Sequence, residues 1–135
     1  MKKLFFLFFI FFYSSIYAQI QVDSLRFKRA QKAPKTFDVK YLARFLKAGA
    51  ISDEKTVETF YYWVHQNIEY DVELSKKDSI SEIDISVLKT LENKKTICAG
   101  YANLFFELCQ AVKIECVVVE GVAQIDDEKT AQLHA

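Results

Sequence analysis

Cys98 is the residue whose type and position most directly suggest chemistry. It opens a segment with the spacing of a helix that buries one face. A thiol at the first turn of a helix meets the positive end of the helix dipole and unpaired backbone N–H groups. Both favour the thiolate, which is the nucleophilic form of cysteine. A small buried residue without a chemical role is the competing interpretation, because free cysteine is among the most buried residue types. The apolar residues of the helical face are Tyr101, Leu104, Phe105, Leu108, Cys109 and Val112.

Three stretches of the chain resemble the transglutaminase-like family. In TICAGYANLF (96–105) the cysteine opens a helix and Gly-Tyr-Ala follows closely. Upstream, WVHQNIEYD (63–71) is similar to the family's Trp-(Ile/Val)-x-x-Asn-Ile-x-Tyr-Asp element. Downstream, His134 stands where the family places its histidine. The resemblance spans 37–135, and three elements in the right order are far more specific than any one alone.

The resemblance implies acyl transfer at a Cys-His site. Cys98 would attack an amide carbonyl of a protein or peptide substrate, with His134 as its base and the backbone N–H of Cys98 as an oxyanion donor. The family's third residue, an aspartate on the next strand, has no match, because the sequence stops one residue after His134. Hydrolysis and transfer to an amine both stay open. Two alternatives also stay open: a non-catalytic binding or structural module, and an inactive truncated domain.

The elements around these residues indicate an α+β fold of the papain-like, transglutaminase-like kind, with N-terminal helices followed by an antiparallel sheet that is incomplete in this chain. Thr36 is expected to cap a first helix that stops near Gly49. Ser52 or Asp53 is expected to open a second helix. Its expected buried stripe consists of Val57, Phe60, Tyr61, Val64 and Ile68.

A short third helix and two strands complete the expected domain. Asp84 or Ser86 caps the helix, and Asn93 ends it, because asparagine tolerates a left-handed conformation. β-branched residues at 114–120 predict a strand, and a polar turn at 124–132 separates it from a strand opened by Leu133. Antiparallel pairing of the two strands would bring His134 back toward Cys98, as a Cys-His pair requires.

Residues just before the cysteine carry two further expectations. Family members often have glycine two residues before the cysteine, whereas this chain has Thr96, which cannot take a left-handed conformation cheaply. The positive charges of Lys94 and Lys95 would favour the thiolate of Cys98. The alternative interpretation is that they are two solvated lysines in a loop.

The upstream motif contains aromatic and histidine side chains that could serve either in packing or in function. Core packing is the preferred interpretation of Trp63 and Tyr70, and the walls of a substrate groove are the alternative. His65 is a poor candidate for a general base, because such a histidine is more often at the surface or satisfied in the core.

The remaining cysteines suggest neither a metal site nor a full set of disulfides. Three cysteines cannot all pair, and Cys109 lies about 16 Å along a helix from Cys98 at a rise of about 1.5 Å per residue. Cys109 and Cys116 could bridge helix to strand, but two buried thiols are the preferred interpretation. The spacing matches no CxxC pattern and the two histidines lie far apart in sequence, so no metal and no cofactor are expected.

The N-terminus has the pattern of a secretory signal peptide. A basic start at Lys2 and Lys3 precedes an apolar run at 4–12, and Ala18 offers a cleavage site. The run is too short for a membrane span, so residues 1–18 are expected to be removed on export to a secreted or periplasmic location, leaving no stable span. An uncleaved anchor is the alternative. Residues 19–35 are expected to be a polar leader or linker with solvated charges, before a domain at 36–135.

Composition narrows the class of partner. The chain has 135 residues, enough for one domain, with 27% charged and 15% aromatic residues and a formal net charge of zero. No stripe of lysine and arginine is interleaved with aromatic residues, so no nucleic-acid partner is expected. The sequence does not indicate an oligomeric state.

Overall fold

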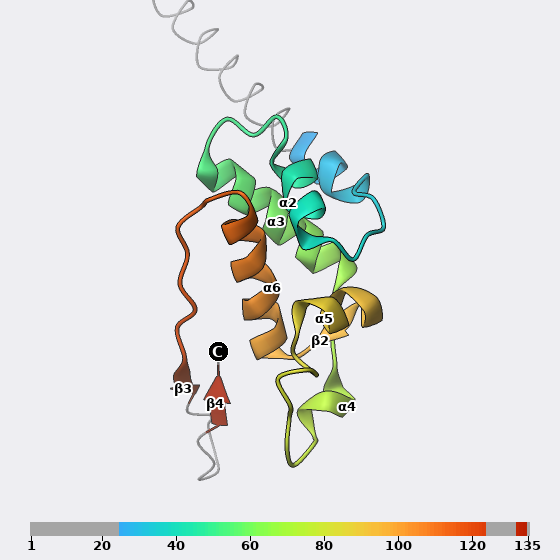
Figure 1. Cartoon of the computed structure of the whole chain (residues 1–135), viewed down its shortest axis with the longest axis vertical. Helices are drawn as coiled ribbons and strands as arrows, with labels where there is room; N and C mark the ends of the chain where they lie inside the picture. The colour runs from blue at the N-terminus through green and yellow to red at the C-terminus, as the bar shows by residue number, and fades with distance from the viewer. Residues whose placement is uncertain (1–24, 124–131, 135) are drawn as a thin grey trace, which may run out of the picture.

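A computed structural model describes residues 25–123 and 132–134 (Figure 1). Residues 25–31 are helical, and helices dominate the part of the chain that follows. The elements after them are α2 (Val39–Lys47), α3 (Asp53–Asn67), β1 (Glu69–Tyr70), α4 (Val72–Ser75), α5 (Val87–Asn93), β2 (Lys95–Thr96), α6 (Cys98–Ala111), β3 (Gly121–Ala123) and β4 (Gln132–His134). This helix-rich architecture with small sheets confirms the mixed helix and strand class.

Side chains at the N-termini fix where the first helices begin. The Asp38 carboxylate accepts hydrogen bonds from the N–H groups of Lys40 and Tyr41 and caps α2. Thr36, the expected cap, instead accepts a hydrogen bond from the Asp38 N–H at 3.0 Å. Ser52 caps α3, in agreement with one of the two residues proposed from the sequence.

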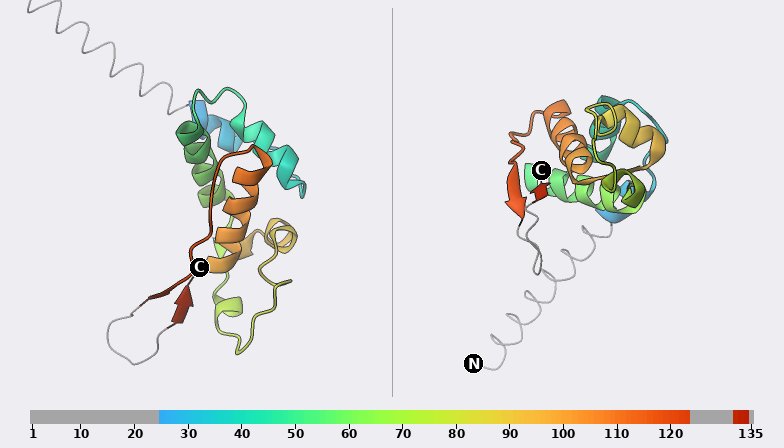
Figure 2. Two further views of the ribbon diagram at one scale, coloured as in Figure 1. Left: turned by 60° about the vertical axis from the view of Figure 1, so that its left-hand side comes forward. Right: turned by 90° about the horizontal axis from the view of Figure 1, so that it is seen from below.

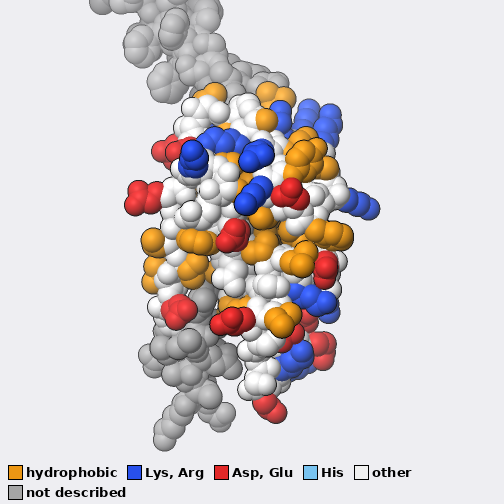
Figure 3. All heavy atoms as spheres, viewed as in Figure 1, with side chains coloured by type: hydrophobic (Ala, Val, Ile, Leu, Met, Phe, Trp, Pro, Cys, Tyr) orange, Lys and Arg blue, Asp and Glu red, His pale blue; other side chains and the backbone are white. Residues whose placement is uncertain are grey.

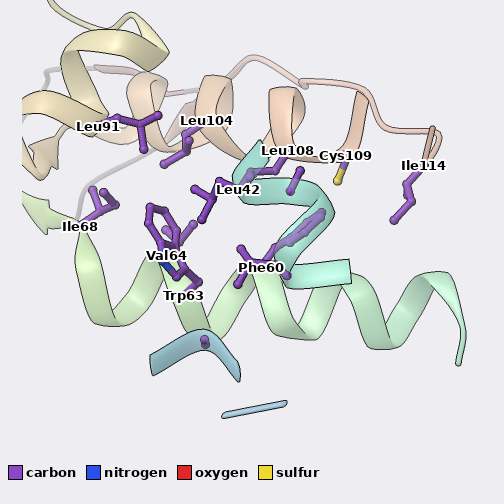
Figure 4. Close-up of a cluster of buried hydrophobic side chains, with 13 residues drawn as sticks. Leu42, Phe60, Trp63, Val64, Ile68, Leu91, Leu104, Leu108, Cys109 and Ile114 are labelled. Carbon is purple, nitrogen blue, oxygen red and sulfur yellow. The ribbon is translucent and has the colours of Figure 1, made fainter. Parts of the chain in front are cut away.

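The core lies between α2, α3 and α6, which pack against one another (Figure 4). On α3 the expected stripe is wrong at one position, because Tyr61 is 60% exposed and Trp63 is buried in its place. The α3 residues buried with Trp63 are Thr56, Thr59, Phe60 and Val64. The large apolar side chains that these three helices bury fully are Leu42, Leu46, Phe60, Leu104 and Leu108.

The strands form two separate ladders of different sense. β1 pairs in parallel with β2, with Tyr70 opposite Thr96. β3 pairs antiparallel with β4, with Gly121 opposite His134. The antiparallel pairing expected between the strand that ends at Ala123 and the strand that contains Leu133 is present as β3–β4. The expectation of an antiparallel sheet is wrong for β1 and β2, which form a separate parallel ladder before α6.

The segment between α6 and β3 is extended but belongs to no strand. Residues 114–120 run back along α6 to β3 (Figure 2). Hydrophobic side chains are exposed on this face (Figure 3), and Val117 and Val119 are each 76% exposed. The strand expected at 114–120 begins only at Gly121, because no neighbouring strand in the described part of the chain pairs with these residues.

Residues 25–31 pack on the helices that follow. Ala30 is 1% exposed and joins the core, Arg26 forms an ion pair with Glu58 at 3.3 Å, and the Arg29 guanidinium donates to the Phe45 carbonyl at 3.1 Å. Solvated charges were expected here, and that expectation is wrong for both arginines. The expected signal peptide at 1–18 lies outside the described residues. Within the described ranges, no helix has the length and apolar character that a membrane span requires.

Candidate functional site

Cys98 is the first residue of α6 and is half-buried. The residue before it, Ile97, occupies the N-cap position in an extended conformation and makes no side-chain capping bond. The first turn contains no acidic residue. The positive end of the helix dipole beside Cys98 is therefore neither capped nor neutralised by a side chain from this turn. That is the environment expected for a residue that handles a developing negative charge.

The β1–β2 ladder holds the chain that leads into Cys98. The Glu69 N–H donates to the Lys94 carbonyl at 2.8 Å, and the Asp71 N–H donates to the Thr96 carbonyl at 2.8 Å. The upstream motif at 63–71 therefore binds the residues immediately before the cysteine. Two stretches that are distant in sequence form one local structure.

A side chain from the nucleophile segment completes this link. The Tyr101 hydroxyl donates a hydrogen bond to the Ile68 carbonyl at 2.9 Å. Burial, followed by the nearby Glu69 and Tyr70, raises the pKa of Tyr101, so the phenol keeps its proton and remains a donor. The Asn67 amide donates to the Trp63 carbonyl at 2.8 Å and closes the last turn of α3.

Thr96 and Gly100 pack against each other at the start of α6. Thr96 is extended in β2 and fully buried, so it needs no left-handed conformation. A left-handed conformation occurs two residues earlier, at Lys94 with φ 57°, one residue after the expected helix end at Asn93. A Cβ built on Gly100 would lie 1.8 Å from Thr96 Oγ1 and 2.9 Å from Thr96 Cβ. Glycine is therefore required at position 100 while threonine occupies position 96.

Both lysines before the cysteine have partners. Lys95 Nζ lies 3.3 Å from Asp71 Oδ2. Hydrogen bonding from the Leu74 N–H, with a smaller contribution from Lys95, lowers the pKa of Asp71. Lys94 Nζ lies 5.2 Å from the centre of the Trp63 ring, a cation–π geometry, and burial lowers its pKa. A direct effect of these two charges on Cys98 stays a prediction.

The aromatic residues and the first histidine of the upstream motif have different positions. Trp63 is buried in the core, as expected. Tyr70 was also expected in the core, and this is wrong, because its side chain is 53% exposed on a two-residue strand whose residues are both exposed. His65 is exposed and its ring stacks on Tyr61, with centroids 6.2 Å apart and an interplanar angle of 5°.

The backbone of β4 brings His134 toward the same end of α6. His134 is the last residue of β4 and pairs with Gly121. In Figures 1 and 2, the C-terminal end of β4 lies beside the N-terminal end of α6, where Cys98 is located. A reacting Cys98–His134 pair stays a prediction.

The other titratable groups do not suggest a metal centre. Within the described ranges, no group of three or more histidine, cysteine, aspartate or glutamate residues is arranged to hold a metal ion. Cys109 and Cys116 are unbridged. Cys109 is buried as expected, whereas Cys116, which was also expected to be buried, is half-buried. Sequence reasoning missed the roles of Tyr101 and Gly100 in placing Cys98. The presence of glycine inside a helix was the available signal, because glycine is otherwise unfavourable there.

Comparison with known proteins places the chain in a family. Residues 40–135 match the family model described as the transglutaminase-like superfamily. The kyphoscoliosis peptidase of Mus musculus is 36% identical over 84 residues, and that of Homo sapiens is 31% identical over 84 residues. Each alignment covers 62% of this chain and 12% of the relative, so the chain spans about an eighth of the length of these proteins. No solved structure gives a significant match. The chain belongs to the transglutaminase-like superfamily.

Proposed function

We propose that this chain carries out cysteine-dependent acyl transfer or amide hydrolysis, with Cys98 as the nucleophile and His134 as its base. The observation that carries the proposal is the start of α6, where a half-exposed thiol stands beside an uncapped helix N-terminus without acidic residues. Backbone N–H groups at such a position suit the oxyanion of an acyl-transfer intermediate. Membership of the superfamily supports cysteine-dependent acyl transfer or proteolysis as the class of reaction.

The proposed reaction has two stages. Cys98 Sγ attacks the amide carbonyl carbon, and the C–N bond breaks as His134 delivers a proton to the leaving amine. The result is a thioester on Cys98. Attack by water then releases a carboxylic acid, whereas attack by a primary amine releases a new amide, and either route restores the thiol. We assign exposed Tyr70, paired with Thr96 just before the nucleophile, to the wall of the substrate groove.

The proposed substrate is a protein or peptide, because transglutaminase-like proteins act on protein substrates. We also propose that the protein is exported to a secreted or periplasmic location, on the basis of the basic start, the apolar run at 4–12 and Ala18. Expression in a bacterial host followed by N-terminal sequencing of the exported chain tests this location. Gln19 is the expected first residue, and a chain retained in the membrane with Met1 intact would contradict it.

One assay separates the two chemical routes. A protein substrate is incubated with the full chain and a biotin-labelled primary amine, since transfer labels the protein and hydrolysis fragments it. We expect Cys98→Ser and His134→Ala to abolish both products. His65→Ala is the matched control, because His65 is exposed and stacks only at the surface with Tyr61. Products that persist in Cys98→Ser would contradict the proposal. A wild-type chain that binds the substrate without any product or acyl adduct on Cys98 would support a binding module instead.

A further inference from the structure

The C-terminus of α6 turns the chain back along its own helix. The Ile114 N–H donates to the Cys109 carbonyl at 3.0 Å, and the Lys113 N–H donates to the Gln110 carbonyl at 3.1 Å. Lys113 takes the left-handed conformation with φ 62°. This pair of bonds is a Schellman motif, which fixes the direction in which the chain leaves the helix. The segment after the turn consequently runs antiparallel to α6, back toward β3 (Figure 1).

The turn brings two thiols together at the edge of the core. Cys109 is 1% exposed and faces the hydrophobic cluster near Ile114 (Figure 4). Cys116 follows two residues after Ile114, is half-buried, and packs against the same cluster. The Cys116 thiol lies close enough to Cys109 to contribute to the pKa of that thiol. Burial first, and then the Cys116 thiol, raises the pKa of Cys109 to about 11.

Contacts on both sides of the turn hold this arrangement. Lys47 on α2 donates from Nζ to the Val112 carbonyl at 3.3 Å, so a second helix stabilises the end of α6. Ile114 is 9% exposed and anchors the returning chain in the core. Neither thiol is therefore on a loosely attached loop.

We propose that Cys109 and Cys116 are a redox pair that closes to an intramolecular disulfide under oxidising conditions, while Cys98 stays free. The required oxidant is a small-molecule disulfide such as oxidised glutathione. Cys116, the more exposed thiol, attacks one sulfur of the oxidant as a thiolate and releases one molecule of reduced thiol, leaving a mixed disulfide. Cys109 Sγ then attacks Cys116 Sγ and releases the second thiol. The protein loses two electrons and two protons, and the oxidant gains them.

Cys98 cannot replace Cys116 as the partner of Cys109. It opens α6, and Cys109 lies about 16 Å farther along the same helix at a rise of about 1.5 Å per residue, far beyond the reach of a disulfide. The bridge would tie the start of the segment that leads to β3 directly to α6. Because β3 pairs with β4, which ends at His134, the bridge would restrict how that strand moves relative to Cys98. This last consequence rests on the proposed function, whereas the bridge itself does not.

Mapping of the three cysteines tests the proposal. The full chain is incubated with oxidised glutathione, alkylated under denaturing conditions and digested with a glutamate-specific protease. Cleavage after Glu92, Glu107, Glu115 and Glu120 puts each cysteine on its own peptide. We expect 108–115 to be linked to 116–120, and 93–107 to contain Cys98 either alkylated or as a mixed disulfide with glutathione, outside any protein bridge. A bridge that contains Cys98, three alkylated cysteines, or disulfides only between chains would each overturn the proposal.

Thermal unfolding supplies a second measurement, independent of the digest. Closing the ring limits the unfolded chain, so the oxidised protein should melt about 5 °C or more above the reduced protein. Oxidation should leave the melting temperatures of Cys109→Ser and Cys116→Ser unchanged, whereas Cys98→Ser should respond like the wild type. If oxidation raised the melting temperature of Cys116→Ser as much as that of the wild type, the result would contradict the bridge. Neither measurement requires catalysis, so failure of the bridge is distinguishable from failure of the proposed function.

Discussion

The Tyr101 hydroxyl donates a hydrogen bond to the Ile68 carbonyl at 2.9 Å, and this bond joins the two sequence motifs of the domain. Tyr101 lies in the first turn of the helix that Cys98 opens, and Ile68 lies just after α3. Two ladder bonds, from Glu69 and Asp71, connect the same segments. The position of Cys98 therefore depends on residues that lie well before it in the sequence.

Removing the Tyr101 hydroxyl should weaken this link. Tyr101→Phe leaves the Ile68 carbonyl, on a residue that is 5% exposed, without its side-chain donor. We expect a loss of roughly 1–2 kcal/mol in the free energy of unfolding. Urea unfolding of the two proteins measures it. Tyr41→Phe is the control, because Tyr41 is 52% exposed and should lose far less. Equal effects of the two substitutions would show that the hydrogen bond is not specifically stabilising.

Gly100→Ala should disrupt the start of α6. The new methyl group would overlap the buried side chain of Thr96, which cannot move freely because it lies in β2. A loss of roughly 3 kcal/mol is expected from overpacking of this kind. Gly121→Ala is the matched control, because nothing lies within 4 Å of a Cβ at that position. Adding Thr96→Gly to Gly100→Ala removes the three atoms nearest to the new methyl group, and should restore part of the lost stability. A double variant no more stable than Gly100→Ala would show that steric overlap is not the cause.

Two buried threonines should respond in opposite ways to replacement by valine. Within the described ranges, Thr96 Oγ1 is buried without a hydrogen-bond partner, whereas Thr56 Oγ1 donates to the Ser52 carbonyl at 3.0 Å. Thr96→Val should be neutral or stabilising by about 1 kcal/mol, because it removes an unsatisfied polar atom. Thr56→Val should destabilise by about 1 kcal/mol, because it breaks a bond. Calorimetric melting of the pair checks the difference, and a substantial loss from Thr96→Val would mean that its hydroxyl has a stabilising partner.

The ionisation of Asp71 should make the free energy of unfolding depend on pH in the acid range. Its pKa is lowered in the folded chain, first by the hydrogen bond from the Leu74 N–H and then by Lys95. A carboxylate with a lowered pKa stabilises the fold above its unfolded pKa of about 3.9, and this contribution is lost as the pH falls through the folded value. Asp71→Asn should therefore be less stable than the wild type near neutral pH, with a smaller further loss below about pH 4. Other carboxyls with lowered pKa, on Glu54 and Asp84, leave some acid dependence in the variant.

Urea unfolding at a series of pH values measures the effect of Asp71→Asn. Asp78→Asn is the control, because Asp78 is an exposed residue of the loop after α4. The control should follow the wild-type curve at every pH. Parallel curves for Asp71→Asn and the wild type through the acid range would contradict a role for this carboxylate.

The helices could be predicted from sequence where side chains alone decide them. Ser52 and Ser86 cap α3 and α5, because their hydroxyl groups accept hydrogen bonds from nearby backbone N–H groups. The buried face of α3 was harder to predict from the sequence, because it includes Thr56 and Thr59, which do not count as apolar residues. Their hydroxyl groups donate to carbonyls one turn earlier and so become compatible with burial.

The sheets depend on partners that sequence pattern does not show. β1 and β2 have two residues each, too few for an alternating pattern, and only contacts across the chain reveal their parallel pairing. The valines at 117–119 have high strand propensity, yet no described strand lies beside them. For the site, the motif identified Cys98, but the contact of Thr96 with Gly100 became visible only in three dimensions.

The short β1–β2 ladder also affects the order in which the chain can assemble. It is a parallel pairing across a long connection that includes α4 and α5, and such non-local contacts form late because a loop must close first. Both strands precede Cys98 in the sequence and leave the ribosome before it, so the cysteine lacks the surroundings that the ladder creates only until residues 69–71 and 94–96 have paired. Any reactivity that depends on those surroundings is consequently withheld until folding is complete.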